Sequence, residues 1–276
     1  MFSNSIRLIV GDEFITEIIL TAAARQAGVN PAEIYVACRR EKRCVQLREQ
    51  YNVRAVLDTS EILPKVKVLM LAFPFGKVTE RELADIAKKI PGDAIIISCV
   101  YGLRIPAIEK IFQGHAVIRV MMNPMIVTGA GICVYALGGV KAEDSENIAQ
   151  FLFKSMGKAI KFDSEAELES VGELIISSTI YSFLAVNALI EGGRKSGIDV
   201  EKTREVVSQV VAGTVETLIN SDAVIDYLIQ QGQEQKNLLK RSKQILERYG
   251  VIDYMRKSLA SADTDEISKF RYRYWQ

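Results

Sequence analysis

The chain has 276 residues, 49% of them hydrophobic and 25% charged, which is typical of a globular protein with a large core. Thirty-five Lys and Arg residues stand against 34 Asp and Glu residues, and the net charge of +1 excludes a global field that would attract nucleic acid or a membrane surface. We therefore expect neither nucleic acid nor a membrane as a partner.

The N-terminal segment has no basic region followed by a long apolar run, so we expect a cytoplasmic protein. Four cysteines, Cys38, Cys44, Cys99 and Cys133, show no C-x-x-C spacing and share one histidine, His115. This pattern predicts reduced thiols and no metal site. His115 has no acid or nucleophile near it in sequence, and we expect it at the surface.

The chain opens with an apolar strand at residues 6–10, which runs into Gly11 and an apolar-faced helix at residues 13–27. Such a strand, turn and helix are typical of the βαβ unit that binds a dinucleotide. The three positions of the usual Gly-x-Gly-x-x-Gly motif read Gly11, Glu13 and Thr16, so only the first glycine is present. The sequence predicts a nucleotide-binding fold with an altered cofactor site.

Up to residue 162, apolar runs alternate with amphipathic helical stretches, which predicts a parallel sheet with helices on its faces. We assign residues 1–162 to a Rossmann-like nucleotide-binding domain of the α/β class. Its strands are expected at residues 6–10, 34–37, 55–56, 66–72, 94–99, 116–121, 133–137 and 159–161. Its helices are expected at residues 13–27, 40–51, 79–89, 105–112 and 142–156.

Residues 163–276 are predicted to form an all-helical domain. Its helices are expected at residues 165–196, at 199–220, at 223–249 with a break near Gly232, and at 252–260. Residues 174–190 carry no charge over 17 positions, fewer than the roughly 20 residues of a membrane span. We expect this buried helix to pack against a second copy of itself, so that the domain forms a homodimer.

Four stretches share a spacing with one known family. They are residues 9–15 (IVGDEFI), 36–40 (VACRR), 119–124 (RVMMNP) with the later Gly129-Ala130-Gly131, and 188–197 (ALIEGGRKSG). Together with the order of the domains, they resemble the pyrroline-5-carboxylate reductase family over nearly the whole chain. In that family a nucleotide-binding domain precedes a helical dimerisation domain.

Other stretches depart from the family's pattern. Residues 176–180 read ISSTI where the family has Ser-Gly-Pro-Ala, and residues 233–239 read QEQKNLL where it has a Pro-Gly-Gly-Thr-Thr loop. Phe73-Pro74-Phe75 stands in place of Val-Lys-Pro. The motifs that contact ligands have changed, while those that shape the fold remain.

The resemblance implies NADP as cofactor and a small cyclic imine as substrate. The implied cofactor contacts are Gly11, Phe14, Ile15, Arg39, Arg40, Ala72, Phe73, Pro74 and Asn123. It also implies that Ser177, Ser178 and Thr179 hold a small acid between subunits, whereas such hydroxyls more often bond back to helix carbonyls. No catalytic residue is assigned.

Charged residues near the predicted phosphate site give opposite predictions about nucleotide binding. Asp12 and Glu13 stand at the start of the first helix, where they either cap the helix themselves or leave a weakened nucleotide site. Arg39 and Arg40, with Lys42 and Arg43 close behind, follow the second strand, where Arg would accept the 2′-phosphate of NADP. The alternative is a solvated helix start.

Three functions therefore stay open. The first is an NADP-dependent reductase of a cyclic imine, of the proline-biosynthesis type. The second is a non-catalytic dimeric relative with an interaction or regulatory role, of the competence-protein type. The third is a reductase of a different small substrate, whose pocket is made more apolar by Phe73, Phe75 and Met125. The aromatic and basic tail at residues 269–276 (KFRYRYWQ) is expected to pack against its own dimer.

Overall fold

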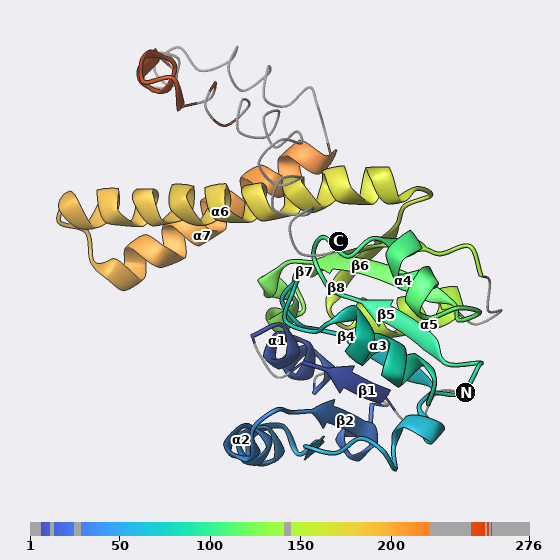
Figure 1. The fold of residues 1–276 in the computed structure, drawn as a ribbon. Helices are drawn as coiled ribbons and strands as arrows, with labels where there is room; N and C mark the ends of the chain where they lie inside the picture. Colours follow the sequence, from blue (N-terminus) through green and yellow to red (C-terminus); the bar gives the residue numbers. More distant parts are fainter. Residues whose placement is uncertain are drawn as a thin grey trace. The chain divides into compact units, whose positions relative to one another are not determined.

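A computed structural model describes residues 7–11, 14–24, 29–140, 145–220, 244–251, 253 and 255. The described chain forms a sheet with flanking helices, followed by long helices (Figure 1). This arrangement confirms the predicted α/β class, with a Rossmann-like sheet before a helical region. Most of the helices predicted at residues 223–249 and 252–260, and all of the tail at residues 269–276, lie outside the described residues.

The eight-stranded sheet has the spatial order β3-β2-β1-β4-β5-β6-β7-β8. Its strands are β1 Arg7–Val10, β2 Ile34–Ala37, β3 Arg54–Val56, β4 Val68–Leu71, β5 Ile95–Ser98, β6 Val117–Met122, β7 Gly131–Leu137 and β8 Gly157–Lys161. Neighbouring strands are parallel, except that β6 and β7 are antiparallel. The connection between β6 and β7 holds only the short 3-10 helix η3, Pro124–Thr128, and is too short for a parallel crossover.

The helices lie close to their predicted positions. They are α1 Phe14–Ala23, α2 Glu41–Tyr51, α3 Glu80–Ala87, α4 Ile105–Ile111, α5 Ser145–Lys154, α6 Glu165–Lys195 and α7 Val200–Asn220, with short 3-10 turns η1 Pro31–Glu33 and η2 Leu63–Lys65. Thr79 caps α3 through a capping box with Glu82, and Asn52 ends α2 in a left-handed conformation with φ of 55°. Local capping chemistry therefore sets these helix ends.

Alternate residues of the strands serve the two faces of the sheet. One buried cluster joins Ile9, Met70 and Ile97 of the sheet to residues of α1, α2 and α5. Leu8 and Leu69, the strand neighbours of Ile9 and Met70, are equally buried but lie outside that cluster, as expected for the opposite face. The sheet is therefore buried on both sides, which is typical of a parallel sheet.

The described chain divides into two compact units, one up to Gly172 and one from Glu173 onward. The division falls inside α6, whereas the sequence analysis placed a domain boundary between residues 162 and 163. The first turns of α6 belong to the sheet unit, where Gly172 approaches the sulfur of Met121 so closely that a Cβ at residue 172 would collide with it.

A charged cluster fixes these first turns of α6. Arg119 of β6 is 1% exposed and pairs with Glu165 and, at 3.1 Å, with Glu169. Arg104 binds both carboxylate oxygens of Glu169 at 2.9 and 3.2 Å, and the amide N–H of Ile105 donates to Glu165 at 2.7 Å. The cluster joins β6, the start of α4 and the start of α6.

The later part of α6 exposes its apolar side chains in the single chain. Leu174, Ile180, Phe183 and Leu184 are each about half exposed or more, with Phe183 at 59%. The expected buried helix is therefore not buried within one chain. A second copy as its cover stays a prediction.

Candidate functional site

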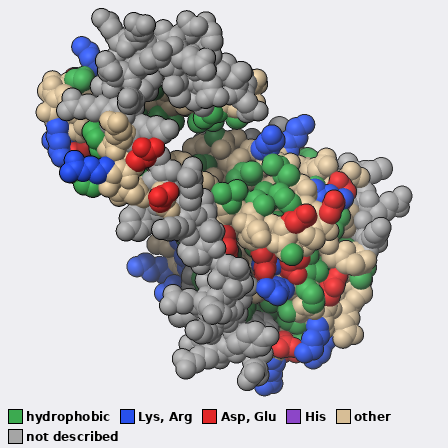
Figure 2. Space-filling model, turned by 90° about the horizontal axis from the view of Figure 1, so that it is seen from above, with side chains coloured by type: hydrophobic (Ala, Val, Ile, Leu, Met, Phe, Trp, Pro, Cys, Tyr) green, Lys and Arg blue, Asp and Glu red, His purple; other side chains and the backbone are tan. Residues whose placement is uncertain are grey.

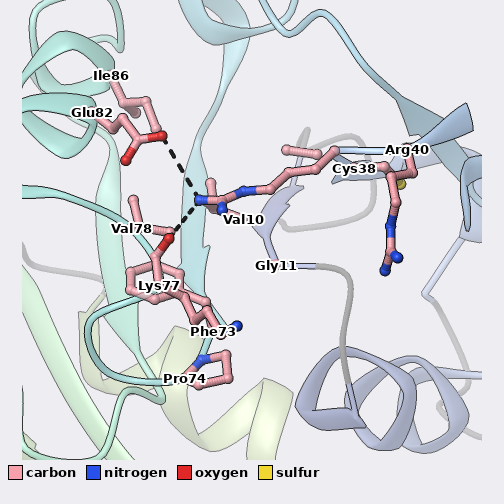
Figure 3. A pocket seen from close by; sticks show the side chains of 12 residues that line it. Val10, Gly11, Cys38, Arg40, Phe73, Pro74, Lys77, Val78, Glu82 and Ile86 are labelled. Carbon is pink, nitrogen blue, oxygen red and sulfur yellow. Dashed lines mark hydrogen bonds and ion pairs between the residues drawn. The ribbon is translucent and has the colours of Figure 1, made fainter.

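A cavity of about 440 Å³ opens at the carboxyl ends of β1, β2 and β4 (Figure 3). Ligands of open parallel sheets bind at this edge, where the chain leaves neighbouring strands in different directions. The lining residues are Val10, Gly11, Ala37, Cys38, Arg39, Arg40, Phe73, Pro74, Lys77, Val78, Glu82 and Ile86. Five of the predicted cofactor residues thus come together here, namely Gly11, Arg39, Arg40, Phe73 and Pro74.

Gly11 is required by the packing of β1 against β4. Its φ is +139°, and a Cβ at this residue would collide with the carbonyl oxygen of Ala72. Thr16, at the third motif position, is fully buried, and its hydroxyl donates to the Gly11 carbonyl at 2.9 Å and approaches the Ala72 carbonyl at 3.4 Å. The altered position therefore ties α1 to both strands. Asp12 and Glu13 lie outside the described residues.

The basic residues after β2 have different surroundings. Arg39 donates to the carbonyl of Lys77 at 2.6 Å and lies 3.7 Å from a carboxylate oxygen of Glu82. The exposed side chain of Arg40 also lines the pocket and makes no hydrogen bond or ion pair with the described residues (Figure 3). Arg43 pairs with Glu17 of α1 and does not line the pocket.

Lys77 and Glu82 line the pocket but were not predicted from the sequence. Lys77 lies in the segment that joins β4 to α3, and Glu82 lies in α3. The oxygen Oε2 of Glu82 accepts hydrogen bonds from the backbone and hydroxyl of Thr79 at 2.7 and 2.8 Å. These bonds, assisted by Arg39, hold the pKa of Glu82 below its usual value. The Thr-x-x-Glu spacing was visible in the sequence as a capping box, but it indicates a helix start and not a pocket.

Four predicted cofactor residues lie outside this lining. Phe14 is 63% exposed on α1, and Ile15 packs against the core. Ala72 is fully buried beside Gly11, with its carbonyl near the position that a Cβ would take. The side-chain oxygen of Asn123 accepts from the amide of Ile132 at 3.1 Å, so this residue braces the turn between β6 and β7.

The residues predicted to make the pocket more apolar are also separated. Phe73 lines the cavity, whereas Phe75 and Met125 do not. Phe75 lies near Gly102, where an added Cβ would sit 3.7 Å from its ring.

The hydroxyls predicted to hold substrate lie on α6, in the second unit. Ser178 donates to the carbonyl of Leu174 at 2.6 Å, and Thr179 donates to the carbonyl of Ile175 at 2.7 Å. Both therefore bond back to their own helix, the alternative considered for them above. Their oxygens keep lone pairs that could accept from a ligand.

His115 is buried, with 6% of its surface exposed, so the prediction of a surface histidine is wrong. Its Nδ1 lies 3.1 Å from the carbonyl oxygen of Ala94, and its ring meets the edge of Phe112. The turn that ends α4 folds His115 back against the sheet, which sequence spacing does not reveal.

Burial also sets the pKa of two thiols, Cys99 just after β5 and Cys133 in β7. It raises the pKa of Cys133 to about 12 and raises the pKa of Cys99 further. Both thiols stay protonated at neutral pH and are poor nucleophiles. Among the described residues there is no group of three His, Cys, Asp or Glu side chains that could hold a metal ion.

Figure 2 shows one face of the molecule, where blue and red side chains are interspersed among hydrophobic ones. The described atoms on this face form no large patch of one charge. Local charge in the pocket, rather than a field over this face, is therefore the feature that can select an anionic ligand.

The curated relatives of this chain include pyrroline-5-carboxylate reductases. The chain is 30% identical over 213 residues to pyrroline-5-carboxylate reductase of Synechocystis, covering 76% of this chain and 78% of that protein. It is 29% identical over 218 residues to pyrroline-5-carboxylate reductase 2 of Bacillus subtilis, covering 77% and 76%. No protein-family model matches the chain.

Solved structures share the fold over almost the whole chain. A pyrroline-5-carboxylate reductase from Coxiella burnetii matches with a TM-score of 0.75 and 22% identity, covering 94% of this chain and 96% of that one. Plasmodium falciparum pyrroline carboxylate reductase, solved with NADP bound, matches with a TM-score of 0.77 and 17% identity, covering 94% and 97%.

Among the described helices, α6 alone has the length and apolarity of a membrane span. One such helix is weak evidence of a membrane, because core helices pass the same test. It spans Glu165–Lys195, in a region that the fold shared with the solved reductase structure includes.

Proposed function

This chain belongs to the pyrroline-5-carboxylate reductase family of NAD(P)-dependent oxidoreductases, and we propose that it is an NADPH-dependent reductase of a small cyclic imine. The observation that carries the proposal is the pocket beside Gly11, which combines a close approach of the backbone after β1 to the backbone after β4 with two arginines at the end of β2. NADPH, when bound, supplies the hydride for the carbon of a C=N bond.

The described residues fit the adenosine half of NADP. The pocket lies at the edge where dinucleotides bind in such sheets, and arginine after the second strand suits a 2′-phosphate better than a ribose hydroxyl. We assign phosphate binding to Arg40 and Arg39, and contact with the nucleotide to Gly11, Phe73 and Pro74. Ile15 and Ala72 support the same edge through packing and Asn123 through turn geometry, while contact of the exposed Phe14 with the cofactor stays part of the proposal.

The substrate would meet the hydroxyls of α6. Ser177, Ser178 and Thr179 are proposed to hold the substrate carboxylate, in a homodimer that also covers the apolar side chains of this helix. The exposure of these apolar side chains supports the dimer, because soluble chains rarely leave such a surface uncovered. A cytoplasmic location is proposed with it.

Steady-state turnover tests the proposal. Purified chain is mixed with NADPH and pyrroline-5-carboxylate, and oxidation of NADPH is followed by absorbance. Saturable oxidation is expected. If NADPH binds but is not oxidised, pyrroline-5-carboxylate is not the substrate. A different imine would then be expected, in line with the changed segment Phe73-Pro74-Phe75.

A non-catalytic dimer is the second candidate. The contacts of Arg39 favour it, because the guanidinium already binds the Lys77 carbonyl and lies near Glu82, where a phosphate would otherwise bind. A chain that binds no NADPH but remains dimeric would support this candidate and contradict the reductase.

A further inference from the structure

Arg39 and Glu82 meet inside the pocket from different elements. The guanidinium of Arg39, just after β2, donates to the Lys77 carbonyl at 2.6 Å and lies 3.7 Å from a carboxylate oxygen of Glu82 on α3. Dashed lines in Figure 3 mark both contacts. The arginine side chain therefore bridges the pocket towards α3.

Glu82 cannot readily move away. One of its oxygens accepts two hydrogen bonds from Thr79, and its own amide N–H donates to the Thr79 hydroxyl at 3.2 Å. The bonds to Thr79 lower the pKa of Glu82, so the carboxylate is charged at neutral pH. Turning the carboxylate away would lose both bonds from Thr79, which form one half of the capping box of α3.

Arg40 offers a contrast within the same pocket. Its side chain is exposed and pairs with none of the described residues, whereas Arg39 must give up Glu82 before it can fully engage a phosphate. The two adjacent arginines therefore differ in the free energy that each can contribute to binding an anion.

We propose that Glu82 is a specificity-determining residue, which restrains Arg39 and thereby weakens the preference of the pocket for a 2′-phosphorylated dinucleotide over the unphosphorylated one. The inference rests on the proposed function. NADH needs no cation at its ribose hydroxyl, so its affinity does not depend on the release of Arg39. The binding free energy that Arg39 contributes to NADPH is reduced by the free energy of its contact with Glu82, which must be broken first.

The test is a fluorescence titration of the full chain and of Glu82→Gln with NADPH and with NADH. Glutamine keeps an oxygen that accepts from Thr79, so the cap survives while the charge is removed. The ratio of NADPH affinity to NADH affinity should rise about twofold, because one exposed ion pair contributes about 0.5 kcal/mol. Asp85→Asn is the matched control, because Asp85 is exposed on α3, pairs with Lys88 and lies outside the pocket lining. It should leave the ratio unchanged.

A second pair of variants tests the route through Arg39. In an Arg39→Gln background, Glu82→Gln should raise the ratio by less than half of its effect in the natural chain. An equal rise in both backgrounds would overturn the proposal.

Two further outcomes separate this inference from the proposed function. If the natural chain binds NADPH and Glu82→Gln leaves the ratio unchanged, the inference is wrong and the reductase proposal stands. If neither the natural chain nor any variant binds either dinucleotide, the reductase proposal is wrong and the inference fails with it.

Discussion

The sheet unit and the helical unit bury their apolar side chains to very different extents. In the first, Leu8, Leu69 and Ile96 are almost completely hidden on a sheet covered on both faces. In the second, Phe183 and Leu184 of α6 are 59% and 62% exposed in the single chain. The first unit closes its core within one chain, whereas the described helices of the second leave large apolar side chains exposed. Four variants test this contrast.

Gly11→Ala should have the largest effect, because Gly11 lies where the backbone after β1 comes closest to the backbone after β4 in the sheet unit. The new Cβ would meet the Ala72 carbonyl at a residue whose φ is +139°. Backbone strain and overpacking together should lower the free energy of unfolding by about 4 kcal/mol. Denaturant unfolding measures the loss. Gly92→Ala is the control, since no atom lies within 4 Å of a Cβ there. Equal stability of the two variants would contradict the role given to Gly11.

Arg119→Met should be the next most damaging change. It leaves Glu165 and Glu169 without their buried cation, although Arg104 still pairs with Glu169. The expected loss is about 3 kcal/mol, at the low end for a broken buried pair, because two nitrogens of Arg119 find no hydrogen-bond partner in the described part of the chain. Thermal unfolding checks it. Lys88→Met, which breaks an exposed pair, should cost far less.

Phe183→Lys tests whether the exposed apolar side chains of the helical unit form a dimer interface. A charge on the exposed apolar side of α6 should weaken association by about 2 kcal/mol for each subunit and leave the sheet unit folded. Light scattering should give about twice the chain mass of 30.7 kDa for the natural protein and a lower mass for the variant. Leu57→Lys, at an exposed leucine of the sheet unit, should not change the mass. A monomeric natural protein would contradict the expected dimer.

Thr79→Ala should have the smallest effect, about 1 kcal/mol at neutral pH, because it removes a helix cap. The pKa of Glu82 is lowered in the folded chain, so its stabilising contribution is present above the unfolded pKa and is lost as the pH falls through the folded one. The difference between the natural chain and the variant should therefore shrink in acid. In a Glu82→Gln background it should not vary with pH.

The sequence predicted the layout of the sheet unit well. Gly11 stood out as a glycine after a short strand, and Arg39 and Arg40 were placed at the end of the second strand, where the pocket is. These features follow from local periodicity and turn chemistry, which a sequence carries directly.

Contacts between distant segments could not be read in the same way. Glu82 has a capping spacing with Thr79, but its approach to Arg39 depends on how α3 packs beside β2. His115 is buried because a turn folds it against the Ala94 carbonyl. The apolar helix at residues 174–190 was predicted from its composition to pack against a second copy, but composition does not show which of its side chains one chain leaves exposed, such as Phe183 and Leu184.

Calorimetric titration of the natural chain with NADPH measures directly whether the pocket binds the cofactor. One binding site per chain is expected, at the pocket beside Gly11 and Arg40. No heat of binding up to millimolar NADPH would contradict the account.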